Sequence, residues 1–313
     1  RVATFPTPMG EKIAIRVLDP EVGLKGLPQL GLLGRNLRVI ETGVKKPYGM
    51  VLITGPTGSG KSTTLYAIMT TMNTEDVNIV SLEDPVEYFI DGLNQSQVRP
   101  EIGYDFAAGL RQILRQDPDV IMVGEIRDQE TAALAVHAAL TGHIVLSTLH
   151  TNNALGVIPR LIDMKVEPFL IPSSLNLILA QRLVSRLCDH CKKPNKVSAE
   201  LQALIAKNMG GLPEDVVHEL EQQNVSFEAP FTTYRAPGCA ECKNKGIVGR
   251  IALFEVLEMT SALEAIITTS PTEQKIAGEA KRQGMISLRQ DGIIKALRGV
   301  VSLEDVLRET REA

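Results

Sequence analysis

Short apolar runs alternate with helical patterns through the middle of the chain. Four runs of strand length stand at residues 50–54, 78–82, 119–123 and 144–149. Apolar residues recur at helical spacing in the segments between them, at 62–72, 106–115 and 129–140. Fully apolar strands that alternate with helices are typical of a parallel sheet covered on both faces. We therefore predict an α/β fold for this part of the chain.

The two ends of the chain have other patterns. Residues 1–5 and 13–18 predict the strands of a hairpin around a turn-rich stretch, and residues 19–48 predict a linker that becomes helical from about 30 to 42. Because the chain opens inside a strand and without Met, we expect a fragment whose N-terminal domain is mostly missing. Residues 157–187 predict mostly helix, and a turn and strand are expected at 246–257. Further helices are expected at 200–209, 213–222, 261–268, 272–283, 287–297 and 303–310, the last with a capping signal at Ser302.

Composition narrows the class of protein. The 313 residues are 44% hydrophobic and 22% charged, an ordinary balance for a soluble globular protein. A net charge of −4 lacks the electrostatic signature of a nucleic-acid-binding chain. No window approaches the roughly 18 unbroken apolar residues of a membrane span.

A glycine-rich loop follows the first strand of the middle part. It has the form G-x-x-x-x-G-K-[ST], and its residues are Gly55, Pro56, Thr57, Gly58, Ser59, Gly60, Lys61, Ser62 and Thr63. In such a loop backbone N–H groups, a helix N-terminus and the lysine charge surround phosphate oxygens, and the Ser62 hydroxyl can bind Mg²⁺. Because a strand precedes it and a helix follows, we predict a nucleoside triphosphate site rather than a chance glycine-rich turn.

Carboxylates follow two further strands. Glu83 and Glu87 come after residues 78–82, and Glu125 comes after residues 119–123. Alone, the first group would indicate a solvated acidic turn, but parallel strands deliver their carboxyl ends to one ligand-binding edge. Gly124 stands where the usual second motif has its metal-binding Asp. We therefore assign Glu125 to activating the attacking water and expect Glu83 or Glu87 to supply the missing metal carboxylate.

Two histidines flank the strand at 144–149. His150 would emerge at the same edge as Glu83 and Glu125, where an imidazole can bond a γ-phosphate or orient water. His143 lies at the other end of the strand. It is the weaker candidate for nucleotide binding, and a helix-cap or turn role is weighed equally.

Four cysteines form two C-x-x-C pairs, Cys188 with Cys191 and Cys239 with Cys242. Each pair can hold one metal with two thiolates, and together they complete a tetrahedral site. We predict a structural zinc site rather than free cysteines. Four thiolates leave no open position for catalysis, and His190, inside the first pair, is a minor alternative ligand.

Several of these motifs, in the same order, resemble the secretion ATPases of type II secretion and type IV pilus assembly. They are GPTGSGKSTTLY, LEDPVEY, RQDPDVIMVGEIRD, TGHIVLSTLHTN, AQRLVSRLC, the paired C-x-x-C and MISLRQDGIIKALRGVVSLEDVLRET. The resemblance covers nearly the whole chain and includes the glycine before Glu125. Retraction ATPases of the same superfamily lack the cysteine pairs, so these favour an assembly or export motor.

The resemblance implies a RecA-like core with a C-terminal helical part. We expect the end of an N-terminal domain at 1–18, a linker and helix at 19–48, the core at 49–187, a tetracysteine metal-binding subdomain at 188–242 and a helical region at 243–313. It also implies ATP and Mg²⁺ as ligands, with Lys61 and Ser62 holding phosphate and metal, Glu83 organising metal and water, Glu125 as general base and His150 sensing the γ-phosphate. Arginines of the preceding domain complete the site in the family, and Arg1 and Arg16 are the candidates here.

The resemblance further implies a cytoplasmic ring hexamer at the inner face of the membrane. Its partner would be an inner-membrane platform protein, through which alone it would meet the membrane. Pilus assembly is slightly favoured over type II secretion, although both share these motifs. A nucleotide-binding scaffold with little turnover and a nucleic-acid motor are the alternatives of other classes, and the acidic charge balance disfavours the motor.

Overall fold

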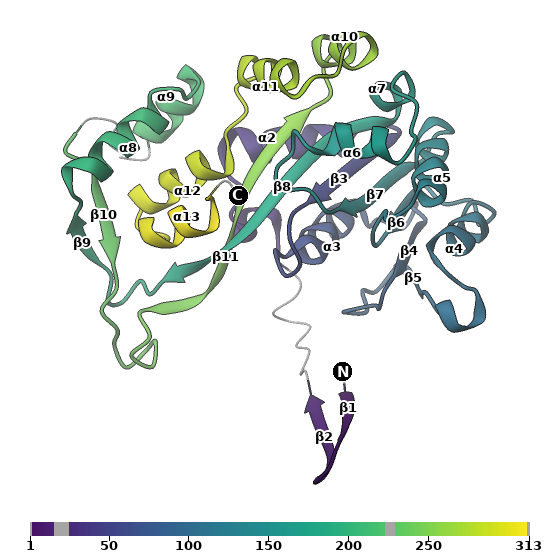
Figure 1. Ribbon diagram of the computed structural model, residues 1–313, viewed down its shortest axis with the longest axis horizontal. Coiled ribbons are helices and arrows are strands. Elements are labelled where there is room, and N and C mark those ends of the chain that lie inside the picture. The colour runs from purple at the N-terminus through teal and green to yellow at the C-terminus, as the bar shows by residue number, and fades with distance from the viewer. Residues whose placement is uncertain (1, 16–24, 223–228, 312–313) are drawn as a thin grey trace.

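The computed structural model describes residues 2–15, 25–222 and 229–311. At its centre is a seven-stranded sheet (Figure 1). In spatial order its strands are β11 (Ile247–Glu258), β8 (Leu175–Leu187), β3 (Gly49–Thr54), β7 (Ile144–Leu149), β6 (Val120–Val123), β4 (Ile79–Glu83) and β5 (Asn94–Gln97). All neighbours pair in parallel except β11, which runs antiparallel to β8.

Helices cover both faces of this sheet. Val51 and Ile53 of β3 belong to one hydrophobic core, while Met50 and Leu52 belong to the other, because successive strand residues point to opposite faces. The core that contains Val51 and Ile53 also includes residues of helices α2 (Gly34–Gly43) and α3 (Lys61–Met72). The other core includes α4 (Phe106–Ile113), α5 (Gln129–Leu140), α6 (Val157–Asp163) and α7 (Leu170–Ser174). The predicted α/β fold is confirmed.

The prediction of helix at the end of the segment 157–187 is wrong. Helices α6 and α7 are short, and β8 follows as a 13-residue strand. β8 lies inside the sheet between β3 and β11, and a hydrophobic core packs against each of its two faces. Ile178 and Ala180 face one core, and Leu177 and Leu179 face the other. A strand that is apolar on both faces loses its period of two, so that periodicity alone does not separate it from a buried helix.

Three short strands were also not predicted. Residues 91–105, expected as loop, contain the edge strand β5 and a 3₁₀ helix η2 (Pro100–Ile102). The sequence of β5 is Asn-Gln-Ser-Gln, which carries no apolar signal. Strands β9 (Lys193–Lys196) and β10 (Thr232–Arg235) pair with each other between the two cysteine pairs.

The helices after residue 188 follow the prediction closely. Helices α8 (Ala199–Met209) and α9 (Glu214–Gln222) lie between the cysteine pairs. The last four are α10 (Ser261–Thr269), α11 (Glu273–Arg282), α12 (Leu288–Leu297) and α13 (Leu303–Glu309). Ser302 Oγ accepts the N–H of Asp305 at 3.1 Å, which confirms the capping signal. The strand predicted at 246–257 is confirmed as β11, which belongs to the central sheet.

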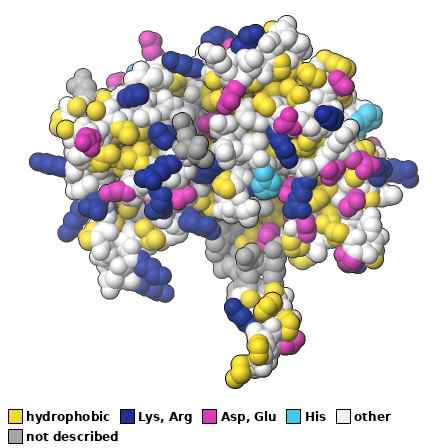
Figure 2. Space-filling model, viewed as in Figure 1, with side chains coloured by type: hydrophobic (Ala, Val, Ile, Leu, Met, Phe, Trp, Pro, Cys, Tyr) yellow, Lys and Arg dark blue, Asp and Glu magenta, His cyan; other side chains and the backbone are white. Residues whose placement is uncertain are grey.

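The predicted N-terminal hairpin is present as β1 (Val2–Thr7) and β2 (Gly10–Ile15). It stands apart from the other elements in Figure 1, and its apolar side chains, Met9 at 96% among them, are exposed (Figure 2). A 3₁₀ helix η1 (Leu27–Leu30) precedes α2. Within the described ranges, none of the helices has the length and hydrophobicity needed to cross a membrane.

Candidate functional site

A cavity of about 530 Å³ opens where β3, β4, β6 and β7 end. These strands are parallel, so their carboxyl ends lie at one edge of the sheet. Residues 57–63 of the glycine-rich loop line the cavity. The predicted side chains that line it with them are those of Glu83, Glu87, Glu125 and His150. Residues from four separate motifs therefore meet at one place.

The glycine-rich loop joins β3 to α3. Gly60, with φ of 90°, adopts the left-handed conformation directly before the helix. The Lys61 ammonium donates to the carbonyls of Gly55 at 2.9 Å and Pro56 at 3.2 Å, so its charge lies over the loop. Burial lowers the pKa of Lys61, which Glu125 opposes. A positive charge, a helix N-terminus and turned backbone amides thus stand together, as phosphate binding requires.

Glu83 ends β4 inside a hydrogen-bonded network. The residue is 4% exposed. Oε1 accepts from Ser81 Oγ at 2.6 Å and from Gln95 Nε2 at 3.1 Å, and Oε2 accepts from the Tyr66 hydroxyl. Burial raises the pKa of Tyr66, and the bond to Glu83 raises it further, so the hydroxyl stays a donor. The network fixes the direction in which Glu83 faces.

Glu125 follows β6 across the cavity. Its Oε2 lies 3.2 Å from His150 Nε2, and its Oε1 forms an ion pair with Arg127. The Arg127 side chain is 64% exposed, whereas that of Glu125 is 13% exposed. A shielded carboxylate beside an imidazole suits proton transfer from water.

Gly55 and Pro56, at the start of the loop, do not line the cavity themselves. Three other predicted residues are not placed there. His143 lies at the opposite end of β7, where its Nδ1 is 2.9 Å from the Ala138 carbonyl of α5. This contact at a helix end agrees with the alternative of a helix-cap or turn residue, and His143 is left out of the proposed site. Arg1 and Arg16 lie outside the described residues.

The cavity also involves residues that the sequence did not single out. Tyr66, Arg127 and Arg250 line it, and Gln181 of β8 bonds to the glycine-rich loop. Tyr66 stands five residues after Lys61, and Arg127 stands two residues after Glu125. Their closeness to these motifs was the signal that the sequence offered for them. The position of Gln181 beside the loop could not be predicted, because its segment was predicted to be helical rather than a strand of the sheet.

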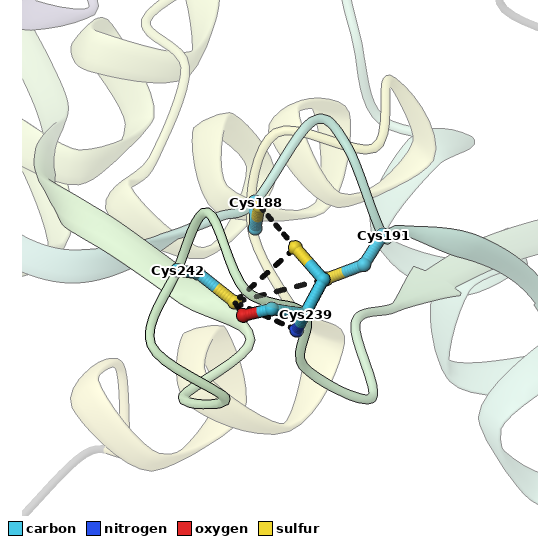
Figure 3. A group of neighbouring side chains, drawn as sticks. All are labelled: Cys188, Cys191, Cys239 and Cys242. Atoms are coloured by element: carbon cyan, nitrogen blue, oxygen red, sulfur yellow. Dashed lines mark hydrogen bonds between the residues drawn. The ribbon is translucent and has the colours of Figure 1, made fainter.

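The four cysteines lie together where β8 ends and β11 begins (Figure 3). Their Sγ atoms are all within 4.8 Å of one another. Burial acts to raise the pKa of Cys242, but backbone N–H groups of Cys239 and Gly246, at 3.1 and 3.2 Å from its Sγ, help to lower it to about 6. Amides directed at sulfur stabilise a thiolate, the form that binds metal. The cluster can therefore hold one metal ion with four sulfur ligands.

Comparison with known proteins agrees with the resemblance seen in the sequence. A model of the family described as type II/IV secretion system protein matches residues 1–308. Type II secretion system protein E of Pseudomonas aeruginosa is 46% identical over 312 residues, covering 100% of this chain and 58% of that protein. The type IV pilus assembly ATPase PilB of Myxococcus xanthus is 46% identical over 310 residues, covering 99% of this chain and 52% of that protein.

A solved structure supports the fold. The pilus retraction motor PilT with bound ADP superimposes with a TM-score of 0.69 at 27% identity, covering 99% of this chain and 73% of that one. The chain spans just over half the length of the curated relatives named above. With the family match over residues 1–308, the chain belongs to the type II/IV secretion system protein family.

Proposed function

We propose that this chain is the ATPase part of a motor that assembles type IV pilus subunits through an inner-membrane platform protein. The observation that carries the proposal is the single cavity in which Lys61 and Ser62 face Glu83, Glu125 and His150. This is the set of groups that phosphoryl transfer to water needs: a phosphate cradle, metal ligands and a base. The names of the relatives support the choice of ATP and of pilus assembly.

Each residue of the cavity has a role in this proposal. The loop from Gly55 to Thr63 holds the phosphates of ATP, with the Lys61 charge on the terminal ones. Ser62 would bind Mg²⁺, and Glu83 and Glu87 would orient the water bound to it. Mg²⁺, when bound, neutralises charge that develops on the phosphate oxygens.

Glu125 takes the proton of the attacking water in this mechanism. Both of its oxygens are engaged, one by Arg127 and one by His150. Each oxygen can accept a second hydrogen bond, so water can reach the carboxylate beside these partners. The Arg127 side chain is 64% exposed and can move into solvent, which widens the approach for water. His150 then keeps Glu125 aligned and bonds the γ-phosphate.

The cysteine cluster has a structural role in this proposal. Zn²⁺ suits four thiolates, and no ligand position remains for water or substrate. We place the metal-binding subdomain at 188–242, between the ATPase core at 49–187 and the region at 243–313, with 1–18 as the end of an N-terminal domain and 19–48 as its linker. Arg1 and Arg16 are proposed to act at the nucleotide when that domain closes.

The working form is proposed to be a cytoplasmic homo-hexamer at the inner face of the membrane. It would meet the membrane through its platform partner alone, and the net charge of −4 disfavours a nucleic-acid partner. Type II secretion is the second candidate, because the two named relatives are equally identical at 46%. A scaffold with little turnover is favoured only by the paired state of Glu125.

Phosphate release tests the proposed activity. The chain is incubated with Mg-ATP at concentrations that favour rings, beside the variant Lys61→Ala. We expect turnover that rises with protein concentration and is lost in the variant, because the phosphates lose their cationic partner. Turnover that persists in Lys61→Ala would refute the assignment of the site, and ATP binding without turnover in the unaltered chain would favour the scaffold.

A further inference from the structure

Gln181 connects the central sheet to the glycine-rich loop. It lies on β8, one residue beyond the pairing of Ala180 with Thr54 at the end of β3. Its side chain is buried, with the residue 2% exposed, on the sheet face that carries Leu177 and Leu179. A buried carboxamide beside an apolar surface is costly unless its polar atoms are bonded.

Both ends of this carboxamide bond to the loop or to the helix that follows it. Nε2 donates to the Ser59 carbonyl at 2.8 Å, and Oε1 accepts from the Thr64 hydroxyl at 2.8 Å. Lys61 and Ser62 lie between these two anchored residues in the chain. Gln181 thereby fixes the segment that carries the phosphate and metal ligands.

Two glycines of the loop allow this approach. A Cβ at Gly55 would lie 2.4 Å from the Gln181 carbonyl oxygen, and a Cβ at Gly60 would lie 2.9 Å from its Nε2. Positive φ angles of 146° and 90° favour glycine at both places as well. Both ends of the loop are therefore packed against this single residue of β8.

We propose that Gln181 is a positioning residue of the glycine-rich loop: its carboxamide holds Ser59 and Thr64 so that Lys61 and Ser62 face the nucleotide. The inference rests on the proposed function, because it assigns the loop to ATP. Its neighbour Arg182 points to the opposite face and donates to the Asn152 carbonyl at 2.7 Å. Of this pair, Gln181 is the residue whose side chain hydrogen-bonds to the loop, while the Arg182 guanidinium lies beside Gly55, with Nη1 3.4 Å from where a Cβ would stand.

The test compares Gln181→Leu, which keeps the volume and removes both bonds, with the control Gln202→Leu. Gln202 makes a similar clamp, donating to the Phe231 carbonyl at 2.8 Å and accepting from its N–H at 2.7 Å, but it lies on α8. Binding of the non-hydrolysable analogue Mg-AMP-PNP is measured by calorimetry on the full chain, with steady-state kinetics and thermal unfolding of each protein.

We expect Kd and KM to rise about 10- to 30-fold in Gln181→Leu, as two lost hydrogen bonds imply, while kcat changes far less. Gln202→Leu should bind the analogue as the unaltered chain does. If Gln181→Leu binds normally, or if the control loses affinity equally, the inference is wrong and the role is only structural.

A second variant keeps the test decisive if Gln181→Leu does not fold. Thr64→Val removes one of the two bonds with little change of shape and should weaken binding about 3- to 10-fold. Unchanged affinity in Thr64→Val, when Gln181→Leu does not fold, would overturn the inference. Failure of the unaltered chain to bind Mg-AMP-PNP would instead remove the proposed function, and this inference with it.

Discussion

Replacing Tyr66 by Phe tests whether the network around Glu83 fixes this carboxylate. Tyr66 is a fully buried residue of α3, and its hydroxyl donates to Glu83 Oε2 and accepts the N–H of Glu87 at 3.2 Å. Phe keeps the ring and its burial but removes the hydroxyl. The two other donors to Glu83, Ser81 and Gln95, both reach Oε1. Oε2 would therefore lose its bond to a buried hydroxyl.

The expected loss of stability follows from these contacts. A hydrogen bond to a charged group contributes about 1.5–3 kcal/mol, and the longer bond from the Glu87 amide adds about 0.5 kcal/mol. The sum is about 2–3.5 kcal/mol of unfolding free energy. For a chain of this size each kcal/mol lowers Tm by roughly 2–4 °C, so the shift should be about 4–14 °C.

Urea unfolding followed by circular dichroism measures this loss, with Tyr48→Phe as the control. Tyr48 is 48% exposed, so its variant should stay within about 0.5 kcal/mol of the unaltered chain. The Mg²⁺ concentration for half-maximal ATPase activity should also rise in Tyr66→Phe, because Glu83 is no longer oriented. A Tyr66→Phe variant as stable as Tyr48→Phe, with unchanged Mg²⁺ dependence, would refute this account of Glu83.

Three further predictions concern other parts of the chain. Removing bound metal with a chelator should lower Tm by at least about 5 °C in the unaltered chain but not in Cys242→Ser, which should copurify with less metal. The pKa of Glu279 is lowered to about 2, chiefly by its hydrogen bond with Arg282, so this pair stabilises above pH 4.5 and the gain is lost as the pH falls toward 2. Glu279→Gln should therefore lower the unfolding free energy by about 1–2 kcal/mol at pH 7 and hardly at all near pH 2. The value at pH 7 allows for solvent screening, because the arginine is exposed. Lys295→Met should lower the unfolding free energy measured in urea by about 3–5 kcal/mol. The change leaves the Asp291 carboxylate, whose side chain is only 14% exposed, without the ammonium 2.5 Å away.

The sequence predicted the edge of the sheet where ligands bind. Lys61, Glu83, Glu125 and His150 each follow a short apolar run or end one, and parallel strands bring such positions together. The sequence could not show which of these side chains contact one another. That Glu125 bonds both Arg127 and His150 depends on side-chain directions, which no spacing specifies.

Strand β8 marks the limit of reasoning from periodicity. Because both of its faces are apolar, the sequence pattern did not indicate a strand. The position of Gln181 beside the glycine-rich loop could therefore not be predicted either. Burial of both faces against two cores is a tertiary property, which overrides the local pattern. The edge strand β5 was missed for the opposite reason, since its four residues are all polar.

The most direct test of the central claim separates binding from hydrolysis in Glu125→Gln. This change keeps the shape of the side chain and an oxygen for His150, but it removes the base. The account predicts that Mg-ATP binds as tightly as it does to the unaltered chain, while steady-state phosphate release falls by at least about 100-fold. Phosphate release at the rate of the unaltered chain would contradict it and remove Glu125 from the reaction.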